Sequence, residues 1–431
     1  MGQQRNWSGN VAWEAADVAR PSSVEAVRAV LAEARSAGRT VRPAGSRHSF
    51  TPLCATDGIS LDLGALSGLR RSDGELITVG AGTPLHRLNA LLDGIGRAMP
   101  NLGDIDRQTI SGAISTGTHG TGASFAGLAA FVDSFTLVTA AGDVLSCSRD
   151  ANPELFHAAM VGLGAFGVVT DLTLRTVPAF GLEQRVAPES FPSIMARLPE
   201  LLAEDHFEFF WFPLGEAAQV KTTRRMSSDE PTAPLSPVRH YVEDVLLENA
   251  SFGAMCKVAR RWPGQLPRLH QLAGRLISTR EFSDASHKVY ATTRSVKFVE
   301  SEYAIPRADL SHVLEELRTL ARRLPVGPAF PAEVRFAAAD DIWLSTGFER
   351  ENAYVAIHQY AGMPFEEYFA EFARICAAVQ GRPHWGKMHP LVAADLETLY
   401  PRFGEVAALR RELDPDGLFL NEHLRAVFGE D

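Results

Sequence analysis

Two charged residues in the last third of the chain, Glu333 and Arg335, are spaced as a pair that could do chemistry. They alternate by two within the otherwise apolar residues 332–336, so a strand would project both side chains from one face. That face can present an acid and a guanidinium to one ligand, or it can hold an ion pair on the surface of a sheet. His358, on an expected strand at 354–360, is in the same way either a catalytic group or a hydrogen-bonded core residue.

A second candidate segment, nearer the C-terminus, has the sequence Arg382-Pro-His-Trp-Gly-Lys-Met-His389. Its two histidines have four residues between them and no cysteine or acidic companion at the spacing of metal ligands, so we expect no metal site. The four cysteines of the chain lack CxxC spacing as well, which fits reduced thiols in a cell interior. Lys387 is the basic residue at the centre of the segment.

Near the N-terminus, residues 42–50 have the sequence Arg-Pro-Ala-Gly-Ser-Arg-His-Ser-Phe and follow a short predicted strand. Proline, glycine and two serines let the backbone turn sharply with its N–H groups on one side. Such a concavity binds anions, most often the phosphates of a cofactor. Taken alone, this segment with His48 at its centre could equally be an ordinary surface turn.

Residues 101–122 form a second stretch of small side chains, in which five glycines are interleaved with serines and threonines: Gly103, Gly112, Gly117, Gly120 and Gly122. Side chains this small let the backbone lie against a flat, polar ligand, which suits a dinucleotide. A third glycine pattern, GxGxxG at 162–167, follows an expected helix and precedes an expected strand. That order is the reverse of a Rossmann fingerprint, so we reject nicotinamide binding there.

Together the first two stretches resemble the cofactor domain of the vanillyl-alcohol oxidase superfamily, and most closely its aldonolactone and alditol oxidase branch. The resemblance implies FAD, commonly bonded through its 8α carbon to the histidine that His48 matches. It implies a strand backbone, at Val169, against the adenine. The implied cofactor-binding residues are His48, Arg42, Pro43, Ala44, Gly45, Ser46, Arg47, Ser49, Gly103, Asp104, Ser111, Gly112, Ser115, Thr116, Thr118, His119, Gly120 and Val169.

The resemblance extends to the C-terminal third. In that branch a His-Trp-Gly/Ala-Lys motif brings a lysine into the active site beside the arginine of a Glu-Val-Arg strand, and Lys387, Arg335 and Glu333 match these motifs. We take these three and His358 as the candidate catalytic residues. Oxidation of an alcohol carbon moves a hydride to the flavin and releases the hydroxyl proton. Two cations can polarise the hydroxyl and hold negative charge, while Glu333 orients the substrate or fixes Arg335.

The implied function is FAD-dependent oxidation of a hydroxyl of a sugar-derived substrate. The substrate would be an aldonolactone, such as L-gulono- or D-arabinono-1,4-lactone, or an alditol. Dioxygen is the favoured electron acceptor, because Gly103 stands where some dehydrogenases of the branch have an alanine that obstructs oxygen. The alternatives are a dehydrogenase that uses a quinone or cytochrome, and a binding protein without turnover. Asp104 replaces a substrate-contacting serine of the alditol oxidases, which gives a lactone more weight.

Composition limits the possible partners. The net charge of -10 would repel nucleic acid and anionic membranes, so we expect neither as a partner. The N-terminus lacks the apolar core of a signal peptide, and no apolar run is long enough to span a bilayer. We therefore expect a cytoplasmic protein.

The pattern of elements predicts an α+β fold with a two-part FAD-binding domain of the vanillyl-alcohol oxidase (PCMH) type and a central α+β substrate domain. The expected division is 1–178 for the FAD domain, 179–380 for the substrate domain and 381–431 for a C-terminal return to the FAD domain. We expect a mobile loop at 227–237 and an aromatic sheet core at 206–213. Helices are expected at 24–37, 84–92, 153–160, 242–261 and 310–323, and strands at 59–63, 76–79, 134–138, 143–146, 168–177, 296–304, 332–336 and 354–360.

Overall fold

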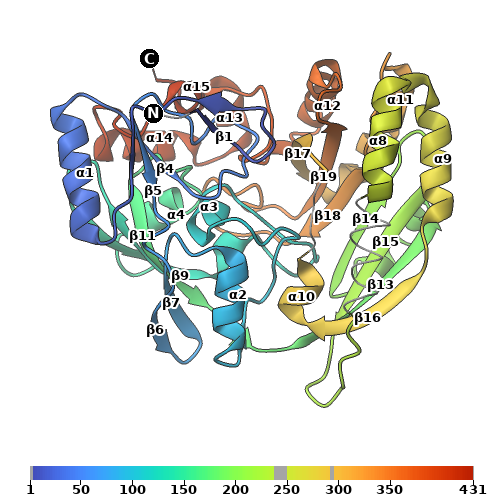
Figure 1. The fold of residues 1–431 in the computed structure, drawn as a ribbon, viewed down its shortest axis with the longest axis horizontal. Coiled ribbons are helices and arrows are strands. Elements are labelled where there is room, and N and C mark those ends of the chain that lie inside the picture. The colour runs from blue at the N-terminus through green and yellow to red at the C-terminus, as the bar shows by residue number, and fades with distance from the viewer. Residues whose placement is uncertain (1–2, 237–249, 292–295, 431) are drawn as a thin grey trace.

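A computed structural model describes residues 3–236, 250–291 and 296–430 of the chain (Figure 1). Its N-terminal part begins with a small sheet and a capped helix, where Ser23 Oγ accepts a hydrogen bond from the Ala26 N–H at 3.1 Å. A three-stranded parallel sheet of order β3-β5-β4 has its first strand before this helix and its other two strands after it. The elements of this part are β1 (Gln4–Arg5), β2 (Ala12–Trp13), β3 (Asp17–Ala19), α1 (Val24–Ser36), β4 (Val41–Ala44) and β5 (Ile59–Asp62).

A five-stranded antiparallel sheet of order β10-β9-β11-β7-β6 completes this half of the molecule. The predicted hairpin is present, with Val144 opposite Val138. The elements are β6 (Leu69–Asp73), β7 (Leu76–Gly80), α2 (Leu85–Asp93), β8 (Arg97–Ala98), α3 (Ile110–Ser115), β9 (Val132–Val138), β10 (Val144–Ser148), α4 (Pro153–Ala159), β11 (Val168–Arg175) and β12 (Val177–Pro178).

The second half is built on an eight-stranded sheet of order β16-β13-β15-β14-β18-β19-β17-β20. Aromatic residues of β14, namely Phe207, Phe209 and Trp211, are buried in its core, which confirms the aromatic run as sheet core. The strands are β13 (Gly181–Ser190), β14 (His206–Trp211), β15 (Ala217–Arg225), β16 (Arg280–Ala285), β17 (Phe298–Pro306), β18 (Ala332–Ala337), β19 (Asn352–Tyr360) and β20 (Arg382–Pro383).

Helices gather on one side of this sheet and leave its other side to face the first half (Figure 1). Apolar residues of α11 and α12 share one core with β14, β17, β18 and β19. The helices of this half are α5 (Phe191–Ala196), α6 (Leu198–Leu201), α8 (Ser251–Arg261), α9 (Leu266–Leu276), α10 (Ser286–Tyr290), α11 (Leu310–Arg323) and α12 (Glu366–Ala377). None of the helices in the described ranges has the length and apolar character that crossing a bilayer requires.

The C-terminal segment returns to the N-terminal half through α13 (Ala393–Leu399), α14 (Phe403–Leu413) and α15 (Glu422–Phe428), drawn in red beside the blue N-terminal strands (Figure 1). The N–H of Val41 donates to the Leu418 carbonyl at 2.8 Å, and the Asn421 amide donates to two carbonyls of the 52–55 loop. The closing segment therefore packs on the cofactor half as expected, while the exact domain bounds at 178 and 381 stay a prediction.

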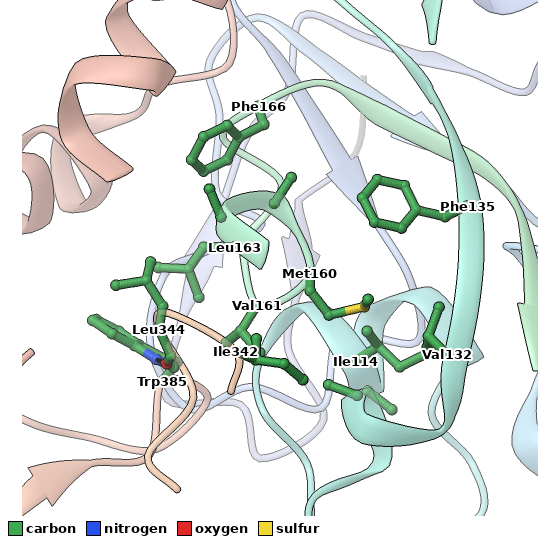
Figure 2. Packing of buried hydrophobic residues seen from close by; sticks show 14 of the residues in the cluster. Ile114, Val132, Phe135, Met160, Val161, Leu163, Phe166, Ile342, Leu344 and Trp385 are labelled. Carbon is green, nitrogen blue, oxygen red and sulfur yellow. Dashed lines mark hydrogen bonds between the residues drawn. The ribbon is translucent and has the colours of Figure 1, made fainter. Parts of the chain in front are cut away.

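A buried apolar cluster joins segments from both halves (Figure 2). Phe135 and Phe166 lie in it with Ile342 and Leu344 from the loop after β18 and with Trp385 from the C-terminal motif. The indole N–H of Trp385 donates to the Leu344 carbonyl at 2.7 Å. This anchor fixes the position of the residues that follow Trp385, including Lys387.

Most predicted helices and strands are found within one or two residues of the expected bounds. The largest differences are two residues: β11 ends at Arg175 rather than 177, β17 is shifted to Phe298–Pro306, β10 ends two residues late, and β9 and β19 each begin two residues early. The strand within the aromatic run 206–213 ends at Trp211. The first part of the predicted helix 242–261 lies outside the described residues, and α8 supplies the rest. Residues 227–236 form no helix or strand, and the predicted mobility of that loop, whose last residue is not described, stays a prediction.

Candidate active site

A groove of about 280 Å³ runs between three segments of the N-terminal half: the loop after β4, the residues around α3, and the turn before β11. Most of the predicted cofactor-binding residues line it. These are Arg42, Pro43, Ala44, Gly45, Ser46, Arg47, His48, Ser49, Ser111, Gly112, Ser115, Thr116 and Val169.

The shape of the groove depends on glycines, which have no side chain to fill it. A Cβ at Gly45 would come 2.3 Å from Thr109 Oγ1, and Gly164 has φ +66°, a backbone region that favours glycine. Arg47 has φ +58°, and within the described residues the N–H groups of Ser46, Arg47 and His48 have no hydrogen-bond partner. Consecutive free N–H groups beside a left-handed residue form a concavity that binds phosphate oxygens. The groove therefore fits a dinucleotide.

Arg42 shapes the wall of the groove. Its buried guanidinium donates hydrogen bonds to the carbonyls of Leu53, Leu163, Gly164 and Phe419 at 2.5–3.0 Å. Burial lowers the pKa of Arg42 to about 10. Because its donors are used on backbone carbonyls, Arg42 joins the loop, the turn before β11 and the C-terminal segment.

His48 lies where the groove meets a second hollow, and it lines both. Its ring stacks on Trp7 with 5.8 Å between centroids. Burial and the nearby charge of Lys387 lower the pKa of His48 to about 4. The imidazole is therefore neutral at ordinary pH, with a nitrogen lone pair available for chemistry.

The second hollow consists of two adjoining cavities of about 70 and 30 Å³ that share several lining residues. Four further residues predicted to bind the cofactor, Gly103, Asp104, Thr118 and His119, line the larger one. Gly120, also predicted to bind cofactor, lines none of these three cavities. A Cβ there would come 2.3 Å from the Leu102 carbonyl, so its role is close packing of the backbone.

One face of the eight-stranded sheet carries the charges of this hollow. Strand pairing sets Glu302, Ala356 and Glu333 in one row across β17, β19 and β18, and it sets Glu300 opposite His358 in the next row. The row on the other side contains Ala304, Tyr354, Arg335, Glu208 and Lys221. Ala356 leaves space at the centre of a ring of polar and charged side chains.

Arg335 is held by three carboxylates. Its guanidinium pairs with Glu333, with Glu208 at 3.0 Å and with Asp104 at 3.3 Å. Burial by itself lowers the pKa of Arg335, but the three carboxylates outweigh it, with Glu333 foremost, and the pKa rises well above its ordinary value. The Glu333–Arg335 pair predicted on one strand face is therefore an ion pair, and it lies inside the cavity.

Lys387 pairs with Glu300, at 2.5 Å between Nζ and the carboxylate, and lies 3.9 Å from Glu302. Its segment runs along β17, where the N–H of Met388 donates to the Glu300 carbonyl at 2.9 Å. Burial lowers the pKa of Lys387, but Glu300 and Glu302 raise it above the ordinary value in sum. His358 Nε2 lies 3.4 Å from Glu300 and 3.9 Å from Glu333, so it connects the lysine pair to the arginine pair.

His119 and Glu302 form a buried hydrogen-bonded pair with 2.6 Å between Nε2 and Oε1. The other ring nitrogen of His119, Nδ1, lies 2.8 Å from the Gly120 carbonyl, which can only accept, so Nδ1 carries a proton. A carboxylate also only accepts, so a second proton must lie between Nε2 and Oε1. The ring stacks on Tyr354 at 3.7 Å, and the pair joins the glycine-rich loop to β17.

Comparison with known proteins now decides the family. A sequence profile described as D-arabinono-1,4-lactone oxidase matches residues 172–427, and one described as FAD binding domain matches residues 15–148. The chain belongs to the D-arabinono-1,4-lactone oxidase family. It is similar to L-gulono-1,4-lactone dehydrogenase of Mycobacterium tuberculosis, with 41% identity over 98% of both chains. It is also similar to L-gulonolactone oxidase of Bos taurus, with 34% identity over 95% of this chain and 94% of the relative.

Alditol oxidase of a Streptomyces species is 32% identical over 97% of both chains. The solved structure of cholesterol oxidase from B. sterolicum superposes with a TM-score of 0.83, covering 99% of this chain and 96% of the other at 17% identity, and it shows the fold alone. As a member of the D-arabinono-1,4-lactone oxidase family, the protein is an FAD-dependent oxidoreductase that acts on CH–OH groups. The predicted α+β fold with an FAD-binding domain is confirmed.

The sequence analysis missed several charged or polar residues that line the second hollow or contact its lining. Glu300 and Glu302 alternate by two on a strand, the same signal that identified Glu333 and Arg335. Glu208 lies within the aromatic run that was interpreted only as core. Tyr354 and His384 stood inside segments that had already been singled out.

The structure also brings an acidic residue and a second histidine from distant segments next to His384. Glu302, His119 and His384 come together closely enough to bind a metal ion, although the C-terminal motif has no acidic neighbour at metal spacing. The hydrogen bonds favour protons over a metal at His384. Its Nδ1 accepts from the Gly386 N–H at 3.0 Å, so its proton lies on Nε2 and neither nitrogen is a free ligand.

Proposed function

We propose that the protein oxidises a hydroxyl of an aldonolactone, such as L-gulono- or D-arabinono-1,4-lactone, and passes the electrons to dioxygen with release of hydrogen peroxide. The observation that carries the proposal is the junction at His48, where a groove for a dinucleotide opens onto a cavity with two buried cations. The names of the relatives support the same substrate class.

FAD would be held by the loop 42–49 and by the residues around α3, and His48 would carry it covalently. FAD supplies an acceptor for the hydride that leaves the alcohol carbon. A neutral imidazole at the edge of the groove has the lone pair that bond formation needs. The loop N–H groups would bind the cofactor phosphates.

Arg335 and Lys387 would bind the substrate hydroxyl and stabilise negative charge as it develops. Both pKa values lie above their ordinary range, so both groups stay protonated and donate hydrogen bonds rather than accept a proton. The hydroxyl proton therefore needs another acceptor. We assign that role to His358, which lines the cavity, with Glu333 fixing Arg335.

Asp104 favours a lactone over an alditol. Its carboxylate lies 3.3 Å from Arg335 and adds a further negative charge near Glu333 and Glu208. An open-chain polyol, which has several hydroxyls to place, remains the second substrate class because alditol oxidase is among the similar proteins.

A dehydrogenase that uses a quinone or cytochrome is the second candidate, because a relative 41% identical to this chain is named a dehydrogenase. Gly103 favours the oxidase, since its lack of a side chain leaves the cavity wall open to oxygen. We further propose a cytoplasmic location and the domain division at 178 and 381.

The test is a panel of aldonolactones and alditols, with peroxide release and bleaching of the flavin absorbance measured together. Bleaching with peroxide on a lactone supports the oxidase. Bleaching without peroxide, followed by rapid recolouring with a quinone, would replace it with the dehydrogenase. A flavin that no compound of the panel bleaches would overturn the proposal of lactone or alditol oxidation.

A further inference from the structure

The helices α8 and α9 lie side by side on the outside of the second half, and their buried residues pack toward the sheet (Figure 1). Eight large apolar side chains are exposed in the part of the chain that the structure describes, and four of them lie on this helix pair and its connection. They include Trp262 at 56% exposure, Leu272 at 51% and Leu276 at 69%. This concentration indicates a surface that contacts something apolar.

The same stretch is basic in an acidic protein. Residues 251–280 contain six lysines and arginines and no aspartate or glutamate, although the net charge of the whole chain is -10. Glu281 is the first acid after the stretch. At physiological ionic strength charges act over about 8 Å, so this local excess, rather than the total, decides what the surface attracts.

Exposed cations of the helix pair have no carboxylate partner in the described part of the chain. Five of them have no ion pair with any described residue: Lys257, Arg260, Arg261, Arg268 and Arg275. By contrast, Arg149, Arg175 and Arg224 are paired with carboxylates at 2.5–2.7 Å. The charge on α8 and α9 is therefore available to an external anion.

The outer face of α9 mixes the two kinds of residue. Leu266 and His270 are buried against the sheet, whereas Arg268, Leu272 and Leu276 are exposed. A helix of an ordinary soluble surface exposes polar residues, but a helix at a membrane interface exposes apolar and basic residues together. Tryptophan is the residue most typical of that interface, and Trp262 stands at the turn between the helices with Arg261 over its ring at 5.5 Å.

We propose that the α8–α9 face docks on the anionic surface of a lipid bilayer. Trp262, Leu272 and Leu276 would enter the headgroup region, and the five exposed cations would bind lipid phosphates. Leu272 and Leu276 lie about one helical turn, about 6 Å, apart on α9, and Trp262 precedes that helix, so the apolar side chains follow the outside of the helix pair. The proposal replaces the expectation that the net charge of the chain repels anionic membranes.

The test is sedimentation of the purified flavoprotein with vesicles of phosphatidylcholine alone and of phosphatidylcholine with phosphatidylglycerol. We expect binding only to the anionic vesicles, weakened by salt. Arg268→Glu/Arg275→Glu should lower the binding constant at least about tenfold. Trp262→Ser/Leu276→Ser should lower it at unchanged charge. Arg39→Glu/Arg411→Glu, which changes the net charge equally at two exposed sites elsewhere, should affect binding far less.

Unaltered flavin absorbance and thermal midpoint would show that each variant is folded. Absence of binding to anionic vesicles would overturn the proposal, and so would equal binding by the helix-pair variants and the control. If the wild type instead forms dimers that the Trp262→Ser/Leu276→Ser variant loses, the face binds a second copy of the chain and the bilayer assignment fails.

Discussion

The groove and the cavity that meet at His48 are built on opposite principles. The groove is lined by glycine, serine, threonine and backbone, and its buried guanidinium, Arg42, is committed to carbonyls of the protein. The cavity is lined by ionised side chains, among them Glu300 and Glu333 on one sheet face and Lys387 from the C-terminal motif. The groove offers a ligand an open volume and backbone N–H donors. The cavity instead offers a ligand charged side chains.

The difference has an energetic consequence. The glycines of the groove cost the folded state conformational entropy, but they bury no charge. Burying charges costs several kcal/mol per ion, which the pairs in the cavity offset only while each partner is present. Changes in the cavity should therefore affect both rate and stability, whereas changes in the groove should act through the cofactor and leave stability nearly unchanged.

The largest expected effect is on the rate of flavin reduction when either cation is removed. Arg335→Ala or Lys387→Ala should slow flavin reduction by about two orders of magnitude or more, because each removes a preorganised positive charge. The double variant should cost less than the sum, since both act on the same developing charge. Anaerobic stopped-flow reduction measures the rate, with the exposed Lys288→Ala as control. A reduction rate of Lys387→Ala near that of the wild type would exclude the role.

Breaking one pair in the cavity should destabilise the fold. Glu300→Ala leaves Lys387 without its nearest carboxylate and should lower the free energy of unfolding by about 3 kcal/mol. The matched exposed change, Glu405→Ala, which breaks a pair with Arg402, should cost less than about 1 kcal/mol. Urea unfolding measures both, and equal losses would contradict the contrast between buried and exposed pairs.

The same carboxylate predicts a pH dependence. Burial by itself raises the pKa of Glu300, but the charges of Lys387 and His358 outweigh burial and lower the pKa to about 2. The pKa in the unfolded chain is about 4.3. Its contribution to stability is therefore complete above pH ~4.3 and is lost as the pH falls toward about 2. The difference in unfolding free energy between wild type and Glu300→Gln should shrink in that window. A constant difference across it would refute the assigned pKa.

In the groove, His48→Ala should leave the fold intact and remove the covalent bond to FAD. Acid precipitation of the wild type should keep the yellow colour in the pellet, whereas the variant should release it to the supernatant. Oxidation should be slower, because the imidazole substituent that withdraws electrons from the flavin is lost. Colour leaving with the supernatant of the wild type would rule out covalent attachment.

The smallest expected effect comes from Gly103→Ala, which tests whether dioxygen is the electron acceptor. A Cβ at Gly103 would lie 3.1 Å from the His119 carbonyl, so an alanine fits after a shift of a few tenths of an ångström. Gly103→Ala should therefore fold and bind FAD while reoxidation by air-saturated buffer slows. Stopped-flow reoxidation compares the two proteins. If the wild type is reoxidised as slowly as the variant, the protein would be assigned as a dehydrogenase rather than an oxidase.

The sequence determined those parts of the site whose geometry is local. A short polar loop with Gly45 turns because glycine permits sharp backbone angles and proline fixes one of them, and Glu333 and Arg335 share a face because strand residues alternate. The bounds of α1 follow from Ser23 as cap and from the spacing of its apolar residues. Strands β13 and β15 were missed because charged residues on their exposed face hide the alternation.

The tertiary structure decided everything that depends on pairing between distant segments. Glu302 meets His119, and Glu300 meets Lys387 and His358, only because β17 is paired in register with β19 and its edge receives the C-terminal motif. Local spacing could not reveal an acidic companion for His384, since that companion, Glu302, lies on β17 about eighty residues earlier in the chain. A strand register is set by burial of a whole sheet face, a sum over many residues, so no single segment contains it.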